Sequence, residues 1–294
     1  MERIVSKKGI LGMVLVSTLS IALLAGCGMN IKGESRSAGS NSSNGITSIP
    51  EMTEDLIAQD ESRELTVHYL PQGYAILESA GQAALLGGCA KEDVDSVTDF
   101  LSEAGIDRLT HIVVPNGDQS RWSGVPEIRE EFGENLVITS RVDGSEEYEQ
   151  FKSGVGNMLM EVGAGSSFNI GTETLQVLGP AVETAENPME ASLVLWTECG
   201  ESSFLFCDDA TQKEISSILA VENDLEARYI FLNGRGETTL PYSAAQQLSP
   251  WEFVVADGAV LPDFGAETPV NLHDLDGQSY SVAASGIDED ALTQ

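Results

Sequence analysis

Short apolar runs alternate with amphipathic segments from about residue 63 onward, and this pattern predicts strands separated by helices. The predicted strands are Leu65–Leu70, Ala75–Glu78, Ala83–Leu86, His111–Val114, Leu136–Ile138, Leu175–Leu178, Ser192–Glu198, Ser203–Cys207, Tyr229–Leu232, Phe253–Ala256 and Tyr280–Val282. The predicted helices are Val94–Glu103, Ser123–Phe132, Glu146–Met158, Lys213–Leu219 and Ala244–Leu248. Locally joined strands with helices inserted between pairs indicate an α+β fold, an αββα sandwich of two mixed sheets with helices outside.

The N-terminus has a different pattern. Arg3, Lys7 and Lys8 precede an apolar run from Gly9 to Leu24, which is typical of an export signal. As a helix the run would cover about 24 Å, short of the roughly 30 Å hydrocarbon core, so a retained membrane anchor is the weaker interpretation.

The apolar run ends in Leu24-Ala25-Gly26-Cys27. This ending resembles the lipobox of bacterial lipoproteins, which implies a diacylglyceryl group on Cys27; the alternative is an ordinary secretory signal. The following residues are rich in Ser, Gly and Asn and predict a flexible tether. We therefore expect a signal peptide at 1–26, the acylated cysteine and a linker at 27–62, and one domain at 63–294.

Charge limits the partners that this chain can bind. The sequence has 47 acidic and 15 basic residues and a formal net charge of −32. Such a field repels polyphosphates, and we find no local basic stripe that would overcome it. We therefore expect no nucleic-acid partner.

Several segments occur in the order typical of a known family. They resemble the metallo-β-lactamase-fold hydrolases of the class found in the extracellular domain of the DNA-uptake protein ComEC. The matching segments are Leu65–Leu77, Leu85–Gly88, Asp107–Val114, Ala191–Leu195, Ser203–Ala210, Leu248–Val255 and Asp274–Gly277. The resemblance implies the metallo-β-lactamase-like version of the two-sheet sandwich.

The residues that hold metal in this family are replaced. Members carry H-x-H-x-D-H after the third core strand, because two divalent metals need imidazoles and carboxylates around a bridging water. Here that loop runs from Asn116 through Asp118 and Ser120 to Arg121, and a guanidinium cannot coordinate a cation. The later histidine-rich loop aligns with Asn233, Gly234 and Arg235. The three histidines, His68, His111 and His273, are interpreted as structural.

One ligand of the family remains. Asp209 matches the aspartate that bridges the two metals, and Asp208 replaces the glycine before it. Together with Asp118, up to three carboxylates lie near the former metal site, and a calcium ion would suit them. Alternatively, Arg121 or Arg235 supplies the positive charge, which we favour because a guanidinium keeps buried carboxylates ionised.

The cysteines add a hypothesis. If Gly200-Glu201 is a two-residue turn, Cys199 faces Ser202, so Cys199 and Cys207 are not cross-strand partners. In the resembled fold, Cys89 and Cys207 both end strands at the same mouth, which makes a disulfide between them possible in an exported protein.

The sequence thus predicts a membrane-tethered, extracytoplasmic lipoprotein with a catalytically degenerate metallo-β-lactamase-like domain. We expect no cofactor and a role in binding a small molecule or a protein, or in scaffolding, at the cell surface. The alternative is a metal-dependent hydrolase, similar to the ComEC domain, with a remodelled metal site.

Overall fold

The described strands form two mixed β-sheets, as the apolar pattern predicts. The computed structural model describes residues 63–133, 135–233, 240–257, 259 and 279–286. The first sheet has the strand order β13 (Tyr280–Ser285), β1 (Glu64–Tyr69), β2 (Ala75–Ser79), β3 (Gln82–Leu86), β4 (His111–Val114), β5 (Leu136–Ser140) and β6 (Leu159–Val162). The second has the order β12 (Glu252–Val255), β11 (Tyr229–Leu232), β10 (Ser202–Asp208), β9 (Val194–Cys199), β8 (Glu173–Gly179) and β7 (Ser167–Ile170).

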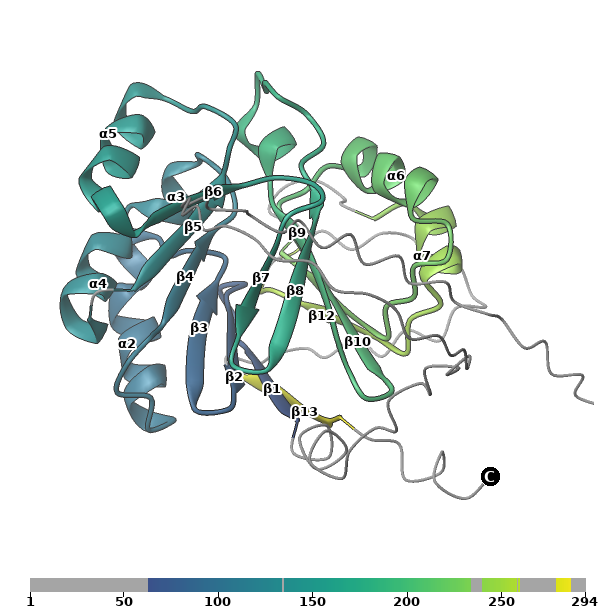
Figure 1. The fold of residues 1–294 in the computed structure, drawn as a ribbon, viewed down its shortest axis with the longest axis horizontal. Helices are drawn as coiled ribbons and strands as arrows, with labels where there is room; N and C mark the ends of the chain where they lie inside the picture. Colours follow the sequence, from purple (N-terminus) through teal and green to yellow (C-terminus); the bar gives the residue numbers. More distant parts are fainter. Residues whose placement is uncertain (1–62, 134, 234–239, 258, 260–278, 287–294) are drawn as a thin grey trace, which may run out of the picture. The chain divides into compact units, whose positions relative to one another are not determined.

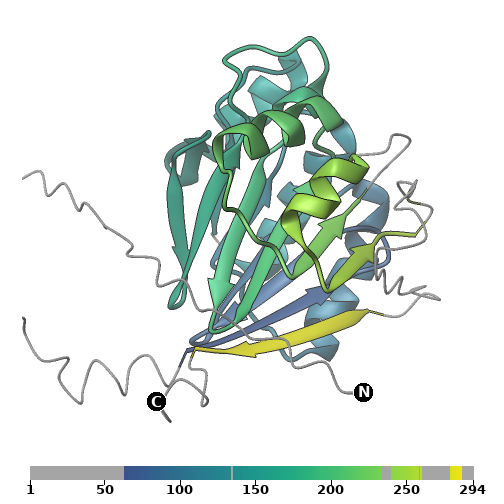
Figure 2. The ribbon, with the colours of Figure 1, turned by 90° about the vertical axis from the view of Figure 1, so that its right-hand side faces the viewer.

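The two sheets share a core that follows from strand periodicity. In β1, Leu65, Val67 and Tyr69 point inward, while in β10 Phe204 and Phe206 do the same. These side chains belong to one buried cluster with residues of both sheets, and the ring centroids of Phe206 and Phe231 lie 4.7 Å apart. The α+β sandwich is therefore present, and Figures 1 and 2 show the two sheets as facing layers.

Helices cover the outer face of each sheet (Figure 1). The helices α2 (Val94–Glu103), α4 (Val125–Phe132) and α5 (Glu146–Val155) bury their apolar positions against the first sheet. On the second sheet, α6 (Gln212–Val221) and α7 (Tyr242–Leu248) do the same. The remaining turns are α3 (Gln119–Trp122) and the 3₁₀ segments η1 (Lys91–Asp93), η2 (Gly156–Met158) and η3 (Pro188–Ala191).

Each predicted strand and helix is present, with ends that shift by up to three residues. Cys199 pairs with Ser202, so the tight turn at Gly200-Glu201 is confirmed. The prediction for Glu146–Met158 was too long, because Gly156 takes a φ of +66° and a 3₁₀ turn follows. The pattern also missed β6 and β7, which have four residues each and, unlike β4 and β11, carry a polar residue between apolar ones, Glu161 and Asn169.

Several predictions concern residues that the structure does not describe. His273 and Arg235 lie there, as do the signal, Cys27 and the linker that we expect at 1–62. Within the described ranges, no helix is both long and apolar enough to cross a membrane.

Candidate functional site

Strand direction brings the predicted site residues to one end of the sandwich. In the first sheet β3 and β4 are parallel, and in the second β10 and β11 are parallel. The carboxyl ends of parallel strands share an edge of their sheet, so the loops after these four strands meet across the sandwich. Gly87, Asn116, Asp209 and Asn233 come from these loops, which makes this edge the candidate site.

Arg121 occupies the centre of this site. Its side chain comes from α3 and has no solvent-exposed area. Nε donates to Oδ2 of Asp209 and Nη2 donates to Oδ1 of Asp209, both at 2.6 Å, which is the bidentate geometry of a strong guanidinium–carboxylate pair. Nη2 also lies 2.8 Å from Oδ1 of Asp208. One guanidinium therefore pairs with both adjacent carboxylates.

A side-chain cap and a backbone hydrogen bond hold α3 in place beside the strand ends. Asp118 caps the helix, since its Oδ1 accepts from the backbone N–H of Ser120 at 2.9 Å and from the Ser120 hydroxyl at 2.6 Å. At the other end, the carbonyl of Arg121 accepts from the backbone N–H of Cys89 at 2.8 Å. A side chain at Gly88 would collide with that carbonyl, so the close approach requires glycine.

Amide side chains surround the ion pair. Asn116 donates to the hydroxyl of Ser192 at 2.6 Å and to Oδ2 of Asp209 at 3.4 Å. Asn233 is buried, and with its amide oxygen turned toward Arg121 it accepts from Nη1 at 2.7 Å and from Nη2. The weaker contact from Nη1 to the carbonyl of Gly87 spans 3.5 Å. These groups satisfy the buried donors and acceptors around the guanidinium.

The electrostatics keep Arg121 charged. Burial alone would lower its pKa, but the carboxylates of Asp208 and Asp209 outweigh that effect and hold the pKa above its ordinary value. Tyr69 lies nearby and donates to the carbonyl of Leu232 at 3.1 Å. Burial, and then the charge of Asp208, raises the pKa of Tyr69, so its phenol stays protonated.

Asp208 has an unusual backbone conformation. Its φ is +46°, a left-handed value that glycine adopts with little cost, and the register between β10 and β11 shifts between Phe206 and Asp208. The resembled family pattern has glycine at this position. The aspartate thus adopts a glycine conformation and places its carboxylate next to Arg121.

The structure brings together Asn116, Arg121, Asp208, Asp209 and Asn233 among the predicted site residues. Asp118 and Ser120 lie at the start of α3, close in sequence to Arg121. Their side chains bond to each other as part of the helix cap and do not join the ion pair. Sequence reasoning missed Ser192 and the carbonyl of Gly87, because no motif marks a partner of that kind.

The disulfide hypothesis is wrong for this structure, in which Cys89 and Cys207 are both free, buried thiols. Cys89 packs in the cluster outside the first sheet, and Cys207 packs in the cluster outside the second. The two thiols lie on opposite outer faces of the sandwich, although β3 and β10 end at the same edge of the sandwich.

The residues present do not fit the metals of the resembled family. His68 bonds to Ser281 and Glu78, and His111 bonds to Thr110, all away from Arg121. The described residues contain no group of three His, Cys, Asp or Glu side chains arranged to hold a metal ion. A calcium ion fits poorly as well, because Arg121 already engages Asp208 and Asp209 while Asp118 caps α3.

A second buried carboxyl group lies near the end of β8. Glu214 is in the first turn of α6, and neither of its carboxyl oxygens has a hydrogen-bond partner in the described structure. The side chain packs so closely on Gly179 that an added Cβ there would lie 2.6 Å from Oε1. Burial, and then the charge of Glu190, raises the pKa of Glu214 to about 8. Its sequence context is an ordinary amphipathic helix, which does not reveal this burial.

Comparison with known proteins adds information on the fold alone. The metallo-β-lactamase fold protein YhfI from Bacillus subtilis is 11% identical over 75% of this chain and 100% of its own, with a TM-score of 0.48. BJP-1, a subclass B3 metallo-β-lactamase of Bradyrhizobium japonicum, is 12% identical over 54% of this chain and 70% of its own, with a TM-score of 0.40.

CmlA, a diiron β-hydroxylase from Streptomyces venezuelae, is 13% identical over 66% of this chain and 45% of its own, with a TM-score of 0.46. This chain therefore spans about half the length of CmlA. No protein-family model matches the sequence, and comparison with curated protein sequences gives no match. These likenesses describe an arrangement of sheets and helices and carry no conclusion about activity.

Replacing Arg121 with methionine tests the buried ion pair. Arg121→Met leaves Asp208 and Asp209 buried without their cation, so we expect the free energy of unfolding to fall by about 3–5 kcal/mol at pH 7. Adding Asp208→Asn and Asp209→Asn removes the unpaired charges and should recover much of this loss. Urea denaturation gives both values. Lys91→Met, at the exposed Lys91–Glu127 pair, should have little effect. Equal stability of Arg121→Met and the wild type would contradict this account.

Glu214→Gln should change how stability depends on pH. The folded-state pKa of about 8 lies above the ordinary value of 4.5. The proton on Glu214 therefore contributes its full share of the free energy of unfolding below pH 4.5. This contribution is lost as the pH rises through 8. Glutamine does not titrate, so the variant should gain about 1–3 kcal/mol over the wild type between pH 5 and pH 8. Urea denaturation at both pH values measures this, and Glu183→Gln controls for the lost charge. A gain that does not depend on pH would contradict the burial of Glu214.

Proposed function

We propose that this protein is an exported, lipid-anchored protein whose metallo-β-lactamase-like domain binds or scaffolds a partner and does not hydrolyse a substrate with a dinuclear metal centre. One observation carries the proposal: the guanidinium of Arg121 lies at the strand ends and pairs with both Asp208 and Asp209. These carboxylates include the position that matches the bridging aspartate of the resembled family.

A metal ion and Arg121 would compete for the same carboxylates. A guanidinium stays protonated in proteins, so it cannot become neutral to make room for a cation. Displacing it would leave a charged group buried without its partners, which costs about 3–5 kcal/mol. This competition supports a structural role for the cluster, in which Arg121 joins the two sheets across the former metal site.

The N-terminal sequence supports the location. Acylation of Cys27 would place two acyl chains in the membrane, which hold a protein far better than one chain. The linker at 28–62 would then tether the domain to the extracytoplasmic face of the cell membrane. A role in binding a small molecule or a protein at the cell surface would account for the anchor.

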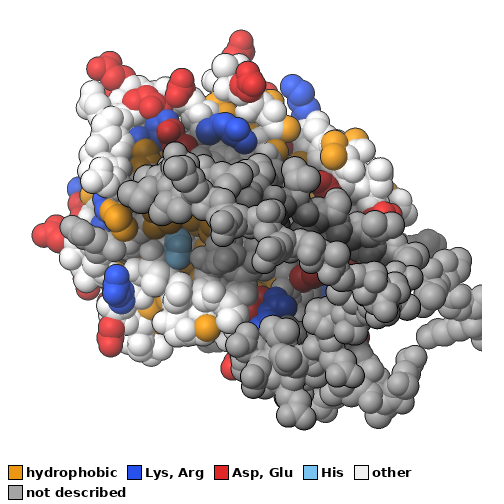
Figure 3. All heavy atoms as spheres, viewed as in Figure 1, with side chains coloured by type: hydrophobic (Ala, Val, Ile, Leu, Met, Phe, Trp, Pro, Cys, Tyr) orange, Lys and Arg blue, Asp and Glu red, His pale blue; other side chains and the backbone are white. Residues whose placement is uncertain are grey.

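Charge supports a partner other than nucleic acid. The net charge of −32 repels polyphosphates, and the described atoms in Figure 3 show no continuous basic area on that face. DNA cleavage of the ComEC kind would require binding against this field. A mobility-shift experiment with the full chain at low salt, where screening is weakest, should show no retarded DNA.

Metal analysis tests the proposal most directly. The full-length chain in detergent, loaded with excess zinc or manganese and then dialysed, should keep far less than one ion per molecule by elemental analysis. Phosphodiesterase turnover should be absent under the same conditions. Two tightly held ions per molecule, with turnover that depends on them, would establish the remodelled hydrolase in its place.

Substitution of Cys27 tests the anchor. Wild-type protein should sediment with membranes and incorporate labelled palmitate, whereas Cys27→Ser should lose the label. Cys89→Ser controls for the loss of a cysteine elsewhere. Equal labelling of Cys27→Ser and the wild type would contradict acylation at Cys27.

A further inference from the structure

Part of the outer face of the second sheet is open beside α6. The apolar cluster beneath α6 and α7 covers β10, β11 and β12. On β8 the outward residues are Thr174 and Gln176, which are exposed, and Leu178, which is half-buried. Among the described helices, α6 reaches β8 only near Leu178 and leaves Thr174 and Gln176 uncovered, whereas the outer face of the first sheet lies beneath α2, α4 and α5.

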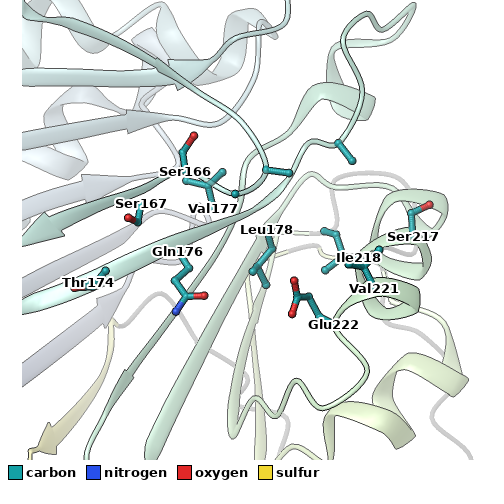
Figure 4. Close-up of a pocket in the computed structure, with 13 residues that line it drawn as sticks. Ser166, Ser167, Thr174, Gln176, Val177, Leu178, Ser217, Ile218, Val221 and Glu222 are labelled. Atoms are coloured by element: carbon teal, nitrogen blue, oxygen red, sulfur yellow. The ribbon is translucent and has the colours of Figure 1, made fainter. Parts of the chain in front are cut away.

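Two hollows meet on this face. One of about 600 Å³ lies between β8, α6 and the turn that leads into β7, and one of about 630 Å³ lies between β8, β9 and the segment after α6. Both are lined by Gln176, Leu178, Val221 and Glu222, so they form one continuous groove. Figure 4 shows Gln176 and Leu178 on the β8 side and Val221 and Glu222 on the α6 side. Each volume falls in the usual range for a binding pocket.

The groove exposes apolar side chains. Val221 is 76% exposed, the largest exposed fraction among the large hydrophobic residues that the structure describes. Leu178 and Trp196 are half-buried beside it, and the Trp196 indole N–H is already bonded to the carbonyl of Glu226 at 3.0 Å. An occupant would therefore gain apolar contact along the middle of the groove.

Acidic side chains line the second half of the groove. They are Glu198, Glu201, Glu222, Asp224 and Glu226, and all five are exposed. Arg228 is the one basic residue in the described lining, and its guanidinium stacks over the Trp251 ring at 4.0 Å and lies 3.9 Å from Glu201. The carboxyl end of α6 points to the same region, and its last turn has no basic residue. The helix dipole therefore adds to the negative potential.

We infer that this groove binds a basic, extended segment of a partner protein. Lysine and arginine side chains have apolar stems that would cover Val221 and Leu178, while their charged ends would reach Glu222 and Asp224. Complementary charge would speed association and select against acidic partners. This inference does not rest on the ion pair of Arg121 with Asp208 and Asp209. Binding in the groove would therefore remain even if that site proved to hold metal.

Fluorescence anisotropy with labelled peptides tests the groove. The full-length chain in detergent should bind a ten-residue peptide that alternates Lys with Leu, and should not bind the matching peptide that alternates Glu with Leu. The double variant Glu222→Lys/Asp224→Lys should weaken binding at least tenfold at physiological salt. The matched control Glu103→Lys/Asp107→Lys makes the same charge change at exposed positions on the other side of the sandwich and should weaken binding less than twofold.

Val221→Ser separates a peptide partner from a bare cation. It should weaken peptide binding several-fold and leave the binding of spermine unchanged. Equal weakening by the two double variants would show attraction to the overall charge alone and would overturn the inference. Absence of peptide binding would overturn it as well, as would full peptide affinity in Val221→Ser.

Discussion

The guanidinium of Arg121 pairs with two carboxylates at the end of β10 in the opposite sheet, and the arrangement of the strand ends depends on this buried contact. Asp209 cannot remain buried and ionised without a cation, Asp208 beside it is partly buried, and Arg121 cannot remain buried without an anion. The loop after β4 and the loop after β10 are therefore held at a fixed separation. Asn116 and Asn233 complete the polar contacts around the pair.

The same contact explains several local features that have no separate cause. Asp118 caps α3 and so sets the direction from which Arg121 enters the site. Gly88 permits the backbone of Arg121 to approach Cys89, and Asp208 adopts a left-handed conformation that directs its carboxylate to the guanidinium. Here a cation that belongs to the chain, the guanidinium of Arg121, connects the strand ends of the two sheets.

Glu214 and the groove beside α6 lie away from this cluster, and their carboxyl groups are in different electrostatic environments. Glu214 is a carboxyl group that burial keeps protonated near neutral pH, because desolvation has the largest influence on its pKa. The groove beside α6 has the opposite character, since carboxylates such as those of Glu222 and Asp224 are exposed to solvent. The contrast among Asp209, Glu214 and Glu222 shows that the environment of each carboxylate, and not its residue type, determines its role.

The sequence by itself determined the strands and helices and hence the two-sheet sandwich, because short apolar periods are a local property. It also determined that three histidines are too few for a dinuclear site of the resembled kind. Only the tertiary structure decided that Arg121 pairs with both Asp208 and Asp209, that Asp118 serves as a helix cap, and that Cys89 and Cys207 lie on opposite faces. These outcomes depend on strand register and on the packing of two sheets, which join residues nearly ninety positions apart in the chain, and local periodicity carries no information about either.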